Sequence, residues 1–330
     1  MPMDIQPFSF SRLALFERSP FLFHKKYILK EDIEEKESDA MNIGSAVDCL
    51  LTQPDDFYTL FTVATVDRPT GQMGDYVDML FKLTSQGVEN AEEDAYSIVG
   101  FKRDSIDKVK ERFLTEGKSY YDFLVSSKDK IVLSFEQYTK ANAAAQILKT
   151  NRFTSKFLAE NLGENIDRYY QKDSTFEYDG IQYKVKLDCI VVDHNTQTIH
   201  PIDIKTTSDS PYAFAKSMTR YRYDLQAVIY SHYISTAFAQ EHLIQNYTIA
   251  PFKFIVINVE YPNNPLIWKM STNDYISAKM GIAGEGGVRG LFDILADLKW
   301  HLDNDVWDYK REVYEKDGEL VTNLYDKTAF

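Results

Sequence analysis

The chain has 330 residues, 44% of them hydrophobic and 14% aromatic, and its formal net charge at pH 7 is −13. This composition is typical of a globular protein with a large core and excludes a disordered chain. The negative charge argues against a protein whose whole surface binds DNA. No apolar run of about 18 residues occurs and the N-terminal residues lack the pattern of a secretion signal, so we expect a cytoplasmic protein without a membrane span. Cys49 and Cys189 both lie in apolar patterns and are expected to be reduced core thiols, too few for a four-cysteine metal centre.

The first half of the chain has the pattern of helices joined by loops. Ser11 and the pair Ser19-Pro20 each precede an apolar stretch, which predicts two short capped helices. Residues 40–52, AMNIGSAVDCLLT, predict a third helix with one apolar face. Prolines and glycines in residues 63–75 predict a loop, and from 75 to 160 the pattern is mainly helical.

Residues 188–207, DCIVVDHNTQTIHPIDIKTT, predict a β-hairpin. Four turn-forming residues, 194–197, separate two runs rich in Val and Ile, so Asp193 should pair with Thr198. Continuing this antiparallel register places Asp188 opposite Asp203. Directly opposed side chains have Cβ atoms about 4.5–5.5 Å apart, so two carboxylates would repel each other unless a cation lies between them.

The alternation of a strand gives this hairpin one apolar and one charged face. The expected core face holds Val185, Leu187, Cys189, Ile202 and Ile204. The opposite face holds Lys184, Lys186, Asp188, Asp203 and Lys205. One interpretation is a solvated face of Lys–Asp pairs, each worth only about 0–1 kcal/mol. The other is a divalent metal site formed by the two carboxylates, with a lysine beside them. The hairpin alone leaves both open.

A further helix is predicted after the hairpin. In RYRYDLQAVIYSHYI, residues 220–234, Arg222, Gln226 and Tyr230 recur at i, i+4 and i+8 and therefore share one helical face. The helix is close enough in sequence to fold back across the hairpin and bring these three polar groups to the aspartate pair. The alternative is an amphipathic helix whose polar side happens to carry them. Lysine and arginine are also concentrated between 181 and 222, which indicates either a basic groove for phosphates or ordinary charge scatter.

The rest of the pattern completes an α/β chain. Residues 252–261, FKFIVINVEY, predict a buried strand, and the charged tail is helical, with Trp300 and Trp307 packing it down. The sequence shows no repeats, low-complexity tract or long linker. We therefore expect a single domain over residues 1–330, with a mainly helical insertion around 63–130 and a helical tail from about 272.

Taken in order, these motifs resemble a known family. An aspartate, then Asp-Ile-Lys one strand later, then Gln-x-x-x-Tyr on the next helix is the pattern of the PD-(D/E)XK nuclease superfamily. The run DIKTTSDSPYAFAKSMTRYRYDLQAVIYSHY is similar to the matching stretch of RecE-type phage exonucleases (exodeoxyribonuclease VIII), a branch that includes RecB-type nucleases and is related to λ exonuclease. SFSRLALFERSPFLFHKKYI also resembles the opening segment of that branch, so that the likeness spans about 8–60 and 165–235.

The resemblance implies a fold and a site. The fold is a restriction-endonuclease-like core, a mixed central sheet flanked by helices, with helical decorations. The implied ligands of Mg²⁺ or Mn²⁺ are Asp48, Asp188, Asp203 and the backbone carbonyl of Ile204. The implied catalytic residues are Asp188, Asp203, Lys205, Gln226 and Tyr230. The implied DNA contacts are Arg222, Arg220, Lys186 and Lys184.

The resemblance also implies an activity and partners. The expected reaction is 5′→3′ degradation of one strand of linear double-stranded DNA, which leaves 3′ single-stranded tails for recombination. The expected partners are DNA ends, a single-strand annealing protein and further copies of the chain in a closed ring, a trimer or tetramer. The expected location is the cytoplasm of a bacterial or phage-infected cell.

Two positions depart from the family pattern. In the Gly-x-x-x-His motif of the branch, Asp48 stands where the histidine is usual, four residues after Gly44. Some relatives carry a glutamate about a strand before the first aspartate, and Gln171-Lys172 occupies that neighbourhood here. These departures favour one alternative, a DNA-binding subunit that keeps the nuclease fold without cleaving. A structure-specific endonuclease of the same superfamily is the other.

Overall fold

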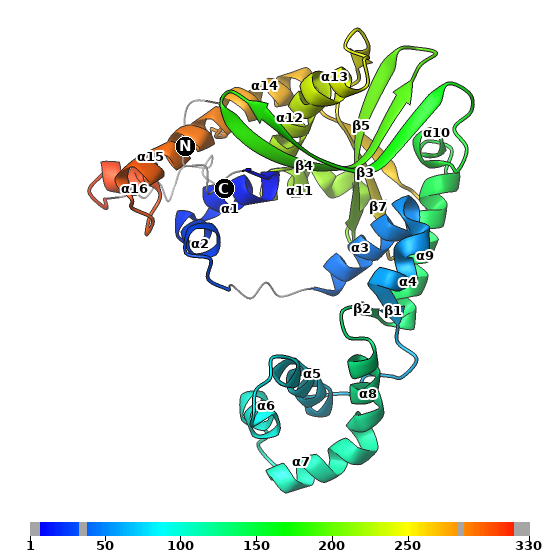
Figure 1. Cartoon of the computed structure of the whole chain (residues 1–330), viewed down its shortest axis with the longest axis vertical. Helices are drawn as coiled ribbons and strands as arrows, with labels where there is room; N and C mark the ends of the chain where they lie inside the picture. The colour runs from blue at the N-terminus through cyan, green and yellow to red at the C-terminus, as the bar shows by residue number, and fades with distance from the viewer. Residues whose placement is uncertain (1–6, 33–37, 283–286, 320–330) are drawn as a thin grey trace. The chain divides into compact units, whose positions relative to one another are not determined.

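The computed structural model describes residues 7–32, 38–282 and 287–319 (Figure 1). The chain divides into two compact units, Met1–Glu37 with Gln146–Phe330 and, separately, Ser38–Ala145. We expected one domain with an insertion around 63–130; the second unit is larger than that insertion because it begins at Ser38. The predicted helix at 40–52 therefore belongs to the second unit.

The first unit is built on a six-stranded mixed sheet with the strand order β3-β4-β5-β7-β8 and with β6 pairing with β5. Its strands are β3 (Ile166–Tyr178), β4 (Ile181–Asp193), β5 (Thr198–Thr207), β6 (Thr248–Ile249), β7 (Lys253–Asn258) and β8 (Leu266–Lys269). The first three strands are antiparallel, whereas β5 and β7 are parallel and β7 and β8 antiparallel. This confirms the expected mixed sheet, and β7 is buried along its whole length, as the apolar run 252–261 predicted.

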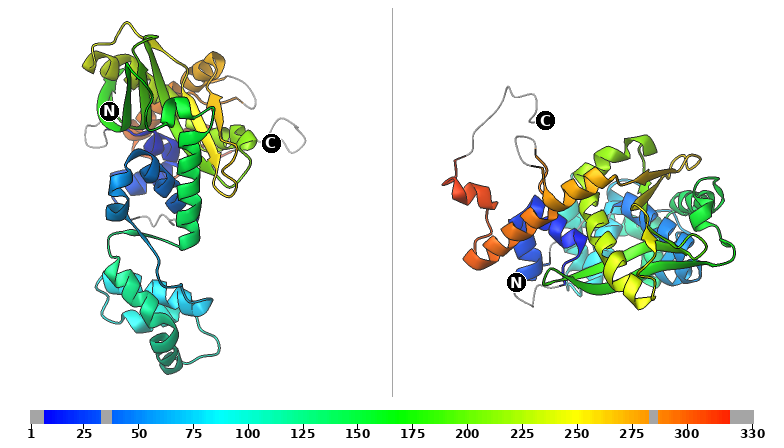
Figure 2. Two further views of the ribbon diagram at one scale, coloured as in Figure 1. Left: turned by 90° about the vertical axis from the view of Figure 1, so that its right-hand side faces the viewer. Right: turned by 90° about the horizontal axis from the view of Figure 1, so that it is seen from above.

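Helices flank this sheet. They are α1 (Phe10–Arg18), α2 (Pro20–Phe23), α10 (Ser155–Leu158), α11 (Phe214–Arg220), α12 (Tyr223–Tyr233), α13 (Ala239–Glu241), α14 (Thr272–Met280), α15 (Leu291–Asn304) and α16 (Arg311–Glu315). Two π-helices, η2 (His24–Ile28) and η6 (Ile234–Phe238), and one 3-10 helix, η5 (Pro211–Ala213), extend or precede these helices. Figures 1 and 2 show α1, α12, α14 and α15 lying against one another beside the sheet, and side chains from all four share one hydrophobic core with β4 and β7.

The caps of the first two helices show how local chemistry sets their boundaries. Ser19 Oγ accepts a hydrogen bond from the Leu22 N–H, as predicted for the second helix. The first helix begins two residues earlier than expected, because Ser9 rather than Ser11 caps it by accepting from the Arg12 N–H. Ser11 instead lies in the first turn, where its hydroxyl hydrogen-bonds with that of Ser9 at 2.8 Å.

The second unit is mainly helical. Its elements are α3 (Asp39–Thr52), η3 (Pro54–Asp56), α4 (Phe57–Leu60), β1 (Phe61–Val63), α5 (Gln72–Ser85), α6 (Ala91–Val99), α7 (Ile106–Arg112), η4 (Phe113–Gly117), α8 (Lys118–Ser126) and β2 (Ile131–Leu133). β1 and β2 form a parallel pair, and α5 to α8 enclose a separate hydrophobic cluster. The long helix α9 (Phe135–Thr150) runs across the boundary between the two units.

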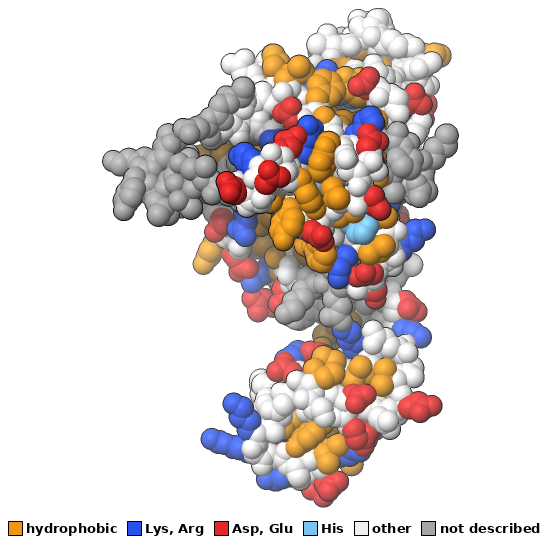
Figure 3. Space-filling view, turned by 90° about the vertical axis from the view of Figure 1, so that its left-hand side faces the viewer, with side chains coloured by type: hydrophobic (Ala, Val, Ile, Leu, Met, Phe, Trp, Pro, Cys, Tyr) orange, Lys and Arg blue, Asp and Glu red, His pale blue; other side chains and the backbone are white. Residues whose placement is uncertain are grey.

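The surface of the chain has mixed charge. On the face shown in Figure 3, acidic and basic side chains are interleaved around a patch of hydrophobic side chains. Within the described residues no helix is both long enough and apolar enough to cross a membrane.

The expected core face of the hairpin is correct only in part. Val185 and Leu187 face the main core of the first unit, but Cys189 and Ile202 are buried outside it, and Ile190 and Val192 take the place in that core that continued alternation would give to Cys189. Ile204 is only partly buried. The strand therefore changes phase near Asp188, and a strict period of two could not show this.

Candidate active site

Asp203 is the centre of a hydrogen-bonded cluster. It lies on β5 and is 2% exposed. Its Oδ1 accepts a hydrogen bond from Gln226 Nε2 at 2.7 Å, and its Oδ2 forms an ion pair with Lys205 Nζ at 2.7 Å. Because β-strand side chains alternate, Lys205 reaches the same face of β5 as Asp203, while α12 lays Gln226 over that face. A buried carboxylate is thus held by one amide and one ammonium group.

Asp188 approaches this cluster from β4, where the two strands separate. The predicted pairing of Asp193 with Thr198 is present, but the β4–β5 ladder ends at Cys189 and Ile202. Beyond that point β5 keeps its pairing with β7, which lies along its other edge. The expected direct pairing of Asp188 with Asp203 is therefore absent, and Asp188 Oδ2 accepts a hydrogen bond from the Ile204 N–H at 2.8 Å.

The backbone of β3 is distorted opposite Asp188. The register of β3 with β4 would place Gln171 against Asp188, but this pair is missing from the ladder, although the pairs on both sides of it are formed. Gln171 has a φ of 48°, in the left-handed region that costs a side-chain-bearing residue about 1–2 kcal/mol. The distortion coincides with the phase change of β4. Strained backbone of this kind concentrates at functional sites, which is consistent with a role for Asp188.

Two tyrosines lie close to the Asp203–Lys205 pair. Tyr230 is 8% exposed, and burial together with the Asp203 charge raises its pKa to about 12. Tyr223 lies under the Lys205 ammonium group, which is 4.3 Å from the ring centroid. Our sequence interpretation missed Tyr223; the signal that could have found it is the tyrosine-rich run RYRY just before Gln226.

Lys205 remains a cation in this environment. Burial favours loss of its proton, but the charges of Asp203 and Asp188 outweigh burial and raise the pKa of Lys205 above its ordinary value. Its side chain is 20% exposed, so it also reaches the surface of the site. The ammonium group therefore offsets the two neighbouring carboxylates.

The predicted helical face of Arg222, Gln226 and Tyr230 is wrong for Arg222. This residue has a φ of 56° and precedes α12 as its N-cap, so the helix begins only at Tyr223. Its guanidinium group forms an ion pair with Glu17 of α1, donates to both carboxylate oxygens of Asp224 at 3.1 Å and donates to the Arg289 carbonyl at 2.7 Å. Its predicted contact with phosphate stays a prediction.

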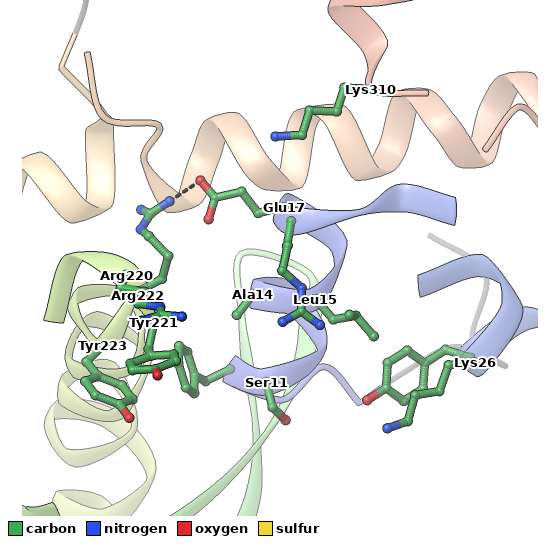
Figure 4. Close-up of a pocket in the computed structure, with 13 residues that line it drawn as sticks. Ser11, Ala14, Leu15, Glu17, Lys26, Arg220, Tyr221, Arg222, Tyr223 and Lys310 are labelled. Atoms are coloured by element: carbon green, nitrogen blue, oxygen red, sulfur yellow. Dashed lines mark hydrogen bonds and ion pairs between the residues drawn. The ribbon is translucent and has the colours of Figure 1, made fainter. Parts of the chain in front are cut away.

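The other predicted DNA contacts line two cavities. Lys184 and Lys186 line a cavity of about 910 Å³ that also includes Tyr230 and Ser11. Arg220 lines a second cavity of about 570 Å³, between α1 and the segment that leads into α12 (Figure 4). Both cavities include Ser11 and Tyr27, so they are neighbours along α1.

A comparison with protein families agrees with this geometry. Residues 9–281 match the model of a family described as PDDEXK-like domain of unknown function (DUF3799). The chain belongs to this PD-(D/E)XK-like family. No curated protein matches the chain. A solved structure named "Putative exonuclease", from Eubacterium rectale, is 12% identical with a TM-score of 0.45, over 95% of this chain and 88% of that one, a likeness too loose to carry an argument.

Nucleases with a PD-(D/E)XK fold generally use divalent metal ions, and the residues present here fit one. Asp188 and Asp203 provide hard oxygen ligands, and Mg²⁺ is commonly bound through one or two carboxylates with waters completing its shell. Gln226 Oε1 is buried without a hydrogen-bond partner among the described residues, and a metal-bound water would satisfy it. The described residues contain no cluster of three or more His, Cys, Asp or Glu side chains that could hold a metal ion, and Asp188 and Asp203 are the carboxylates that the structure brings together here.

Two predicted ligands remain untested. Asp48 lies on α3, in the unit of residues 38–145, and its place in a metal shell stays a prediction. The Ile204 carbonyl also stays a predicted ligand; what the structure shows is that the N–H of Ile204 holds Asp188.

Proposed function

We propose that this PD-(D/E)XK-like protein is a metal-dependent deoxyribonuclease that degrades linear duplex DNA from its ends. The observation that supports this most directly is the buried Asp203, held by Gln226 and Lys205 beside the carboxylate of Asp188. Two hard-oxygen ligands next to a fixed cation are the groups that hydrolysis of a phosphodiester needs.

Each side chain has a role that follows from its position. Asp188 and Asp203 would hold the divalent ion, which when bound would polarise the scissile phosphate and activate a water. Lys205, fixed by Asp203, would offset the negative charge that develops on the phosphate oxygens. Gln226 fixes Asp203 through its amide nitrogen and keeps its Oε1 available to orient a water. Tyr223 and Tyr230 would shield the site from bulk water.

The finer part of this proposal concerns polarity and partners. Degradation would run 5′→3′ and leave 3′ single-stranded tails for a single-strand annealing protein, and a ring-shaped trimer or tetramer would keep the enzyme on its substrate. The support for these points is the resemblance of the motifs to RecE-type exonucleases, which is an argument by analogy.

One assay separates the candidate functions. Linear duplex DNA labelled at one 5′ end, the same duplex labelled at one 3′ end, and a covalently closed circle are incubated with the full chain and Mg²⁺ or Mn²⁺. We expect loss of linear DNA, early release of the 5′ label and an intact circle. Cutting of the circle would indicate an endonuclease, and no cutting of either DNA would indicate a non-cleaving subunit. Asp94→Asn, an exposed change on α6, is the matched control for Asp203→Asn.

A further inference from the structure

The 570 Å³ cavity lies next to the aspartate site. It is lined by α1, η2 and residues 220–223 (Figure 4). Tyr223 links the two, because it lines the cavity while its ring lies 4.3 Å from the Lys205 ammonium group. Pockets of about 300–1,000 Å³ enclose drug-sized ligands, so this one has room for about one or two nucleotides and is too small to enclose a duplex.

The lining of the cavity is strongly basic. Its charged residues are five cations, Arg18, Lys26, Arg220, Arg222 and Lys310, and one carboxylate, Glu17. Glu17 is already paired with Arg222. Arg18, Arg220 and Lys310 are exposed and have no ion-pair partner in the part of the chain that the structure describes. On a protein with a net charge of −13, this concentration of uncompensated positive charge selects an anionic ligand.

The lining also offers an aromatic platform. Tyr223 is fixed by ring contacts with Phe10 and Phe214, at centroid distances of 6.2 and 5.9 Å. Tyr221 lies beside it, with ring centroids 5.6 Å apart, and is 49% exposed. The Arg220 guanidinium is 5.4 Å from the Tyr221 ring centroid. An exposed ring supported by a fixed one suits the face of a nucleobase, and this favours a nucleic acid over an acidic peptide.

We propose that this cavity binds a single-stranded segment of DNA that continues from the phosphate at Asp203. Arg18, Arg220 and Lys310 contact its phosphates, and Tyr221 stacks on a base. This assignment rests on the proposed nuclease function for its substrate, but binding can be measured without cleavage. It also separates two arginines: Arg220 faces the ligand, whereas Arg222 is held by the protein.

The test measures binding by fluorescence anisotropy, with the full chain in EDTA so that no metal-dependent cleavage occurs. The probes are a labelled oligothymidylate of about ten nucleotides and a blunt duplex of the same length. The variants are Arg18→Ala, Arg220→Ala, Lys310→Ala, Tyr221→Ala and Tyr221→Phe. Lys128→Ala is the matched control, because Lys128 is exposed and belongs to the other compact unit.

We expect the oligothymidylate to bind more tightly than the duplex. Each cation variant should reduce the slope of log K against log salt by about 0.7, because one phosphate contact is lost on a single strand. Tyr221→Ala should weaken binding about tenfold with an unchanged slope, since stacking is lost but no charge, and Tyr221→Phe should restore binding. Lys128→Ala should behave as the wild type.

Three outcomes would overturn the proposal. In the first, the duplex binds as tightly as the oligothymidylate and responds to the variants in the same way. In the second, the salt slope stays unchanged in all three cation variants. In the third, polyaspartate competes as strongly as the oligonucleotide and Tyr221→Ala has no effect on binding. Each of these can occur in a protein that cuts DNA normally, which would leave the nuclease function in place. Conversely, if the oligonucleotide binds as expected but no DNA is cut, the cavity assignment stands and the proposed nuclease function is contradicted.

Discussion

At the residue scale, Asp203 and Lys205 depend on each other. The carboxylate is 2% exposed and its Oδ2 is 2.7 Å from the lysine nitrogen, so each group compensates the charge of the other. A buried ion pair of this kind is weak evidence for stability, because both ions lose their hydration. A role in catalysis therefore explains this buried ion pair better than a role in stability does.

We expect Asp203→Asn and Lys205→Ala each to reduce cleavage at least about a hundredfold, because the first removes a charged ligand of the divalent ion and the second removes the cation that offsets charge on the scissile phosphate. Lys216→Ala, an exposed change on α11, should cleave normally. Nuclease assays with Mg²⁺ measure the rates, and thermal melting checks that the variants are folded. A nearly wild-type rate in either variant would remove that residue from the site.

Arg222 is a second case in which the contacts of one residue define its role. With Glu17, Asp224 and the Arg289 carbonyl as acceptors, it connects α1, the start of α12 and the segment before α15. Its side chain is 13% exposed. We therefore expect it to position α12, and with it Gln226, more than to hold a phosphate.

Arg222→Ala should lower the free energy of unfolding by about 3 kcal/mol, because it leaves the carboxylate of Glu17 buried without its partner. The salt slope of DNA binding should stay unchanged, whereas Arg220→Ala should change the slope and not the stability. Urea unfolding and anisotropy titrations measure the two quantities. A stable Arg222→Ala variant with a reduced slope would instead support the predicted phosphate contact.

At the element scale, the irregular point of the sheet is where β3, β4 and β5 meet at Asp188. Gln171 leaves the β3–β4 ladder, β4 changes phase and the β4–β5 ladder ends, all within a few residues of Asp188. In a regular sheet, the backbone of Asp188 would pair with both β3 and β5. The distortion instead lets its carboxylate reach the Ile204 N–H.

A change at Gln171 tests how much backbone strain this point carries. Gln171→Val should lower the free energy of unfolding by about 1–2 kcal/mol, because a β-branched residue tolerates positive φ poorly. Gln171→Asn should change it by less than about 0.5 kcal/mol, since asparagine adopts this conformation more readily. Thr175→Val, on the regular and exposed part of β3, is the control in urea unfolding. Equal effects of the two valine variants would show that the position is unstrained.

A buried lysine links β7 to β5 on the side of the sheet away from Asp203. Lys253 is 6% exposed and hydrogen-bonds with His200 Nδ1 at 3.1 Å. Burial, aided by Lys156 and Lys269, lowers the pKa of Lys253 from 10.5 to about 8. Between these values the unfolded chain binds the proton that the folded chain has released, so this group makes stability rise with pH across the window.

Lys253→Met should therefore remove a rise in stability between about pH 8 and pH 10. The measurement is the difference in the free energy of unfolding between wild type and variant over this range, in which the contributions of all other groups cancel. The difference should shift in favour of the wild type as the pH increases. A difference that does not change with pH would show that Lys253 titrates normally.

At the scale of the whole molecule, the net charge of −13 and the basic surfaces along α1 have to be considered together. An acidic body repels nucleic acid in general, so contacts concentrate where the arginines and lysines gather. The same balance makes a bound divalent cation favourable for the fold, because it neutralises two neighbouring carboxylates. Metal binding and stability should therefore be linked.

Adding Mn²⁺ or Mg²⁺ should raise the melting temperature, because an ion that binds only the folded chain increases the free energy of unfolding. The increase is about 2.7 kcal/mol at a metal concentration 100 times the dissociation constant. Asp188→Asn and Asp203→Asn should each reduce this shift, Asp94→Asn should keep it, and EDTA should reverse it. Differential scanning calorimetry measures the shifts without any substrate. An undiminished shift in the double variant Asp188→Asn/Asp203→Asn would place the bound metal elsewhere.

Local patterns were sufficient to predict most of the elements and the candidate residues. The turn residues 194–197 determined the pairing of Asp193 with Thr198, and Ser19-Pro20 determined the start of α2, because turn and cap chemistry acts over a few residues. The order of Asp188, Asp-Ile-Lys and Gln-x-x-x-Tyr was enough to predict the family.

Only the tertiary structure decided how these parts meet. The β4–β5 ladder ends at Cys189 and Ile202, while β5 continues along its other edge beside β7, and no local pattern predicts the pairing with a strand about fifty residues further along the chain. Arg222 leaves the helical face because its acceptors come from α1 and from Arg289, both distant in sequence. Tyr223 likewise lies against Lys205 only in the folded chain, because the two residues are distant in sequence.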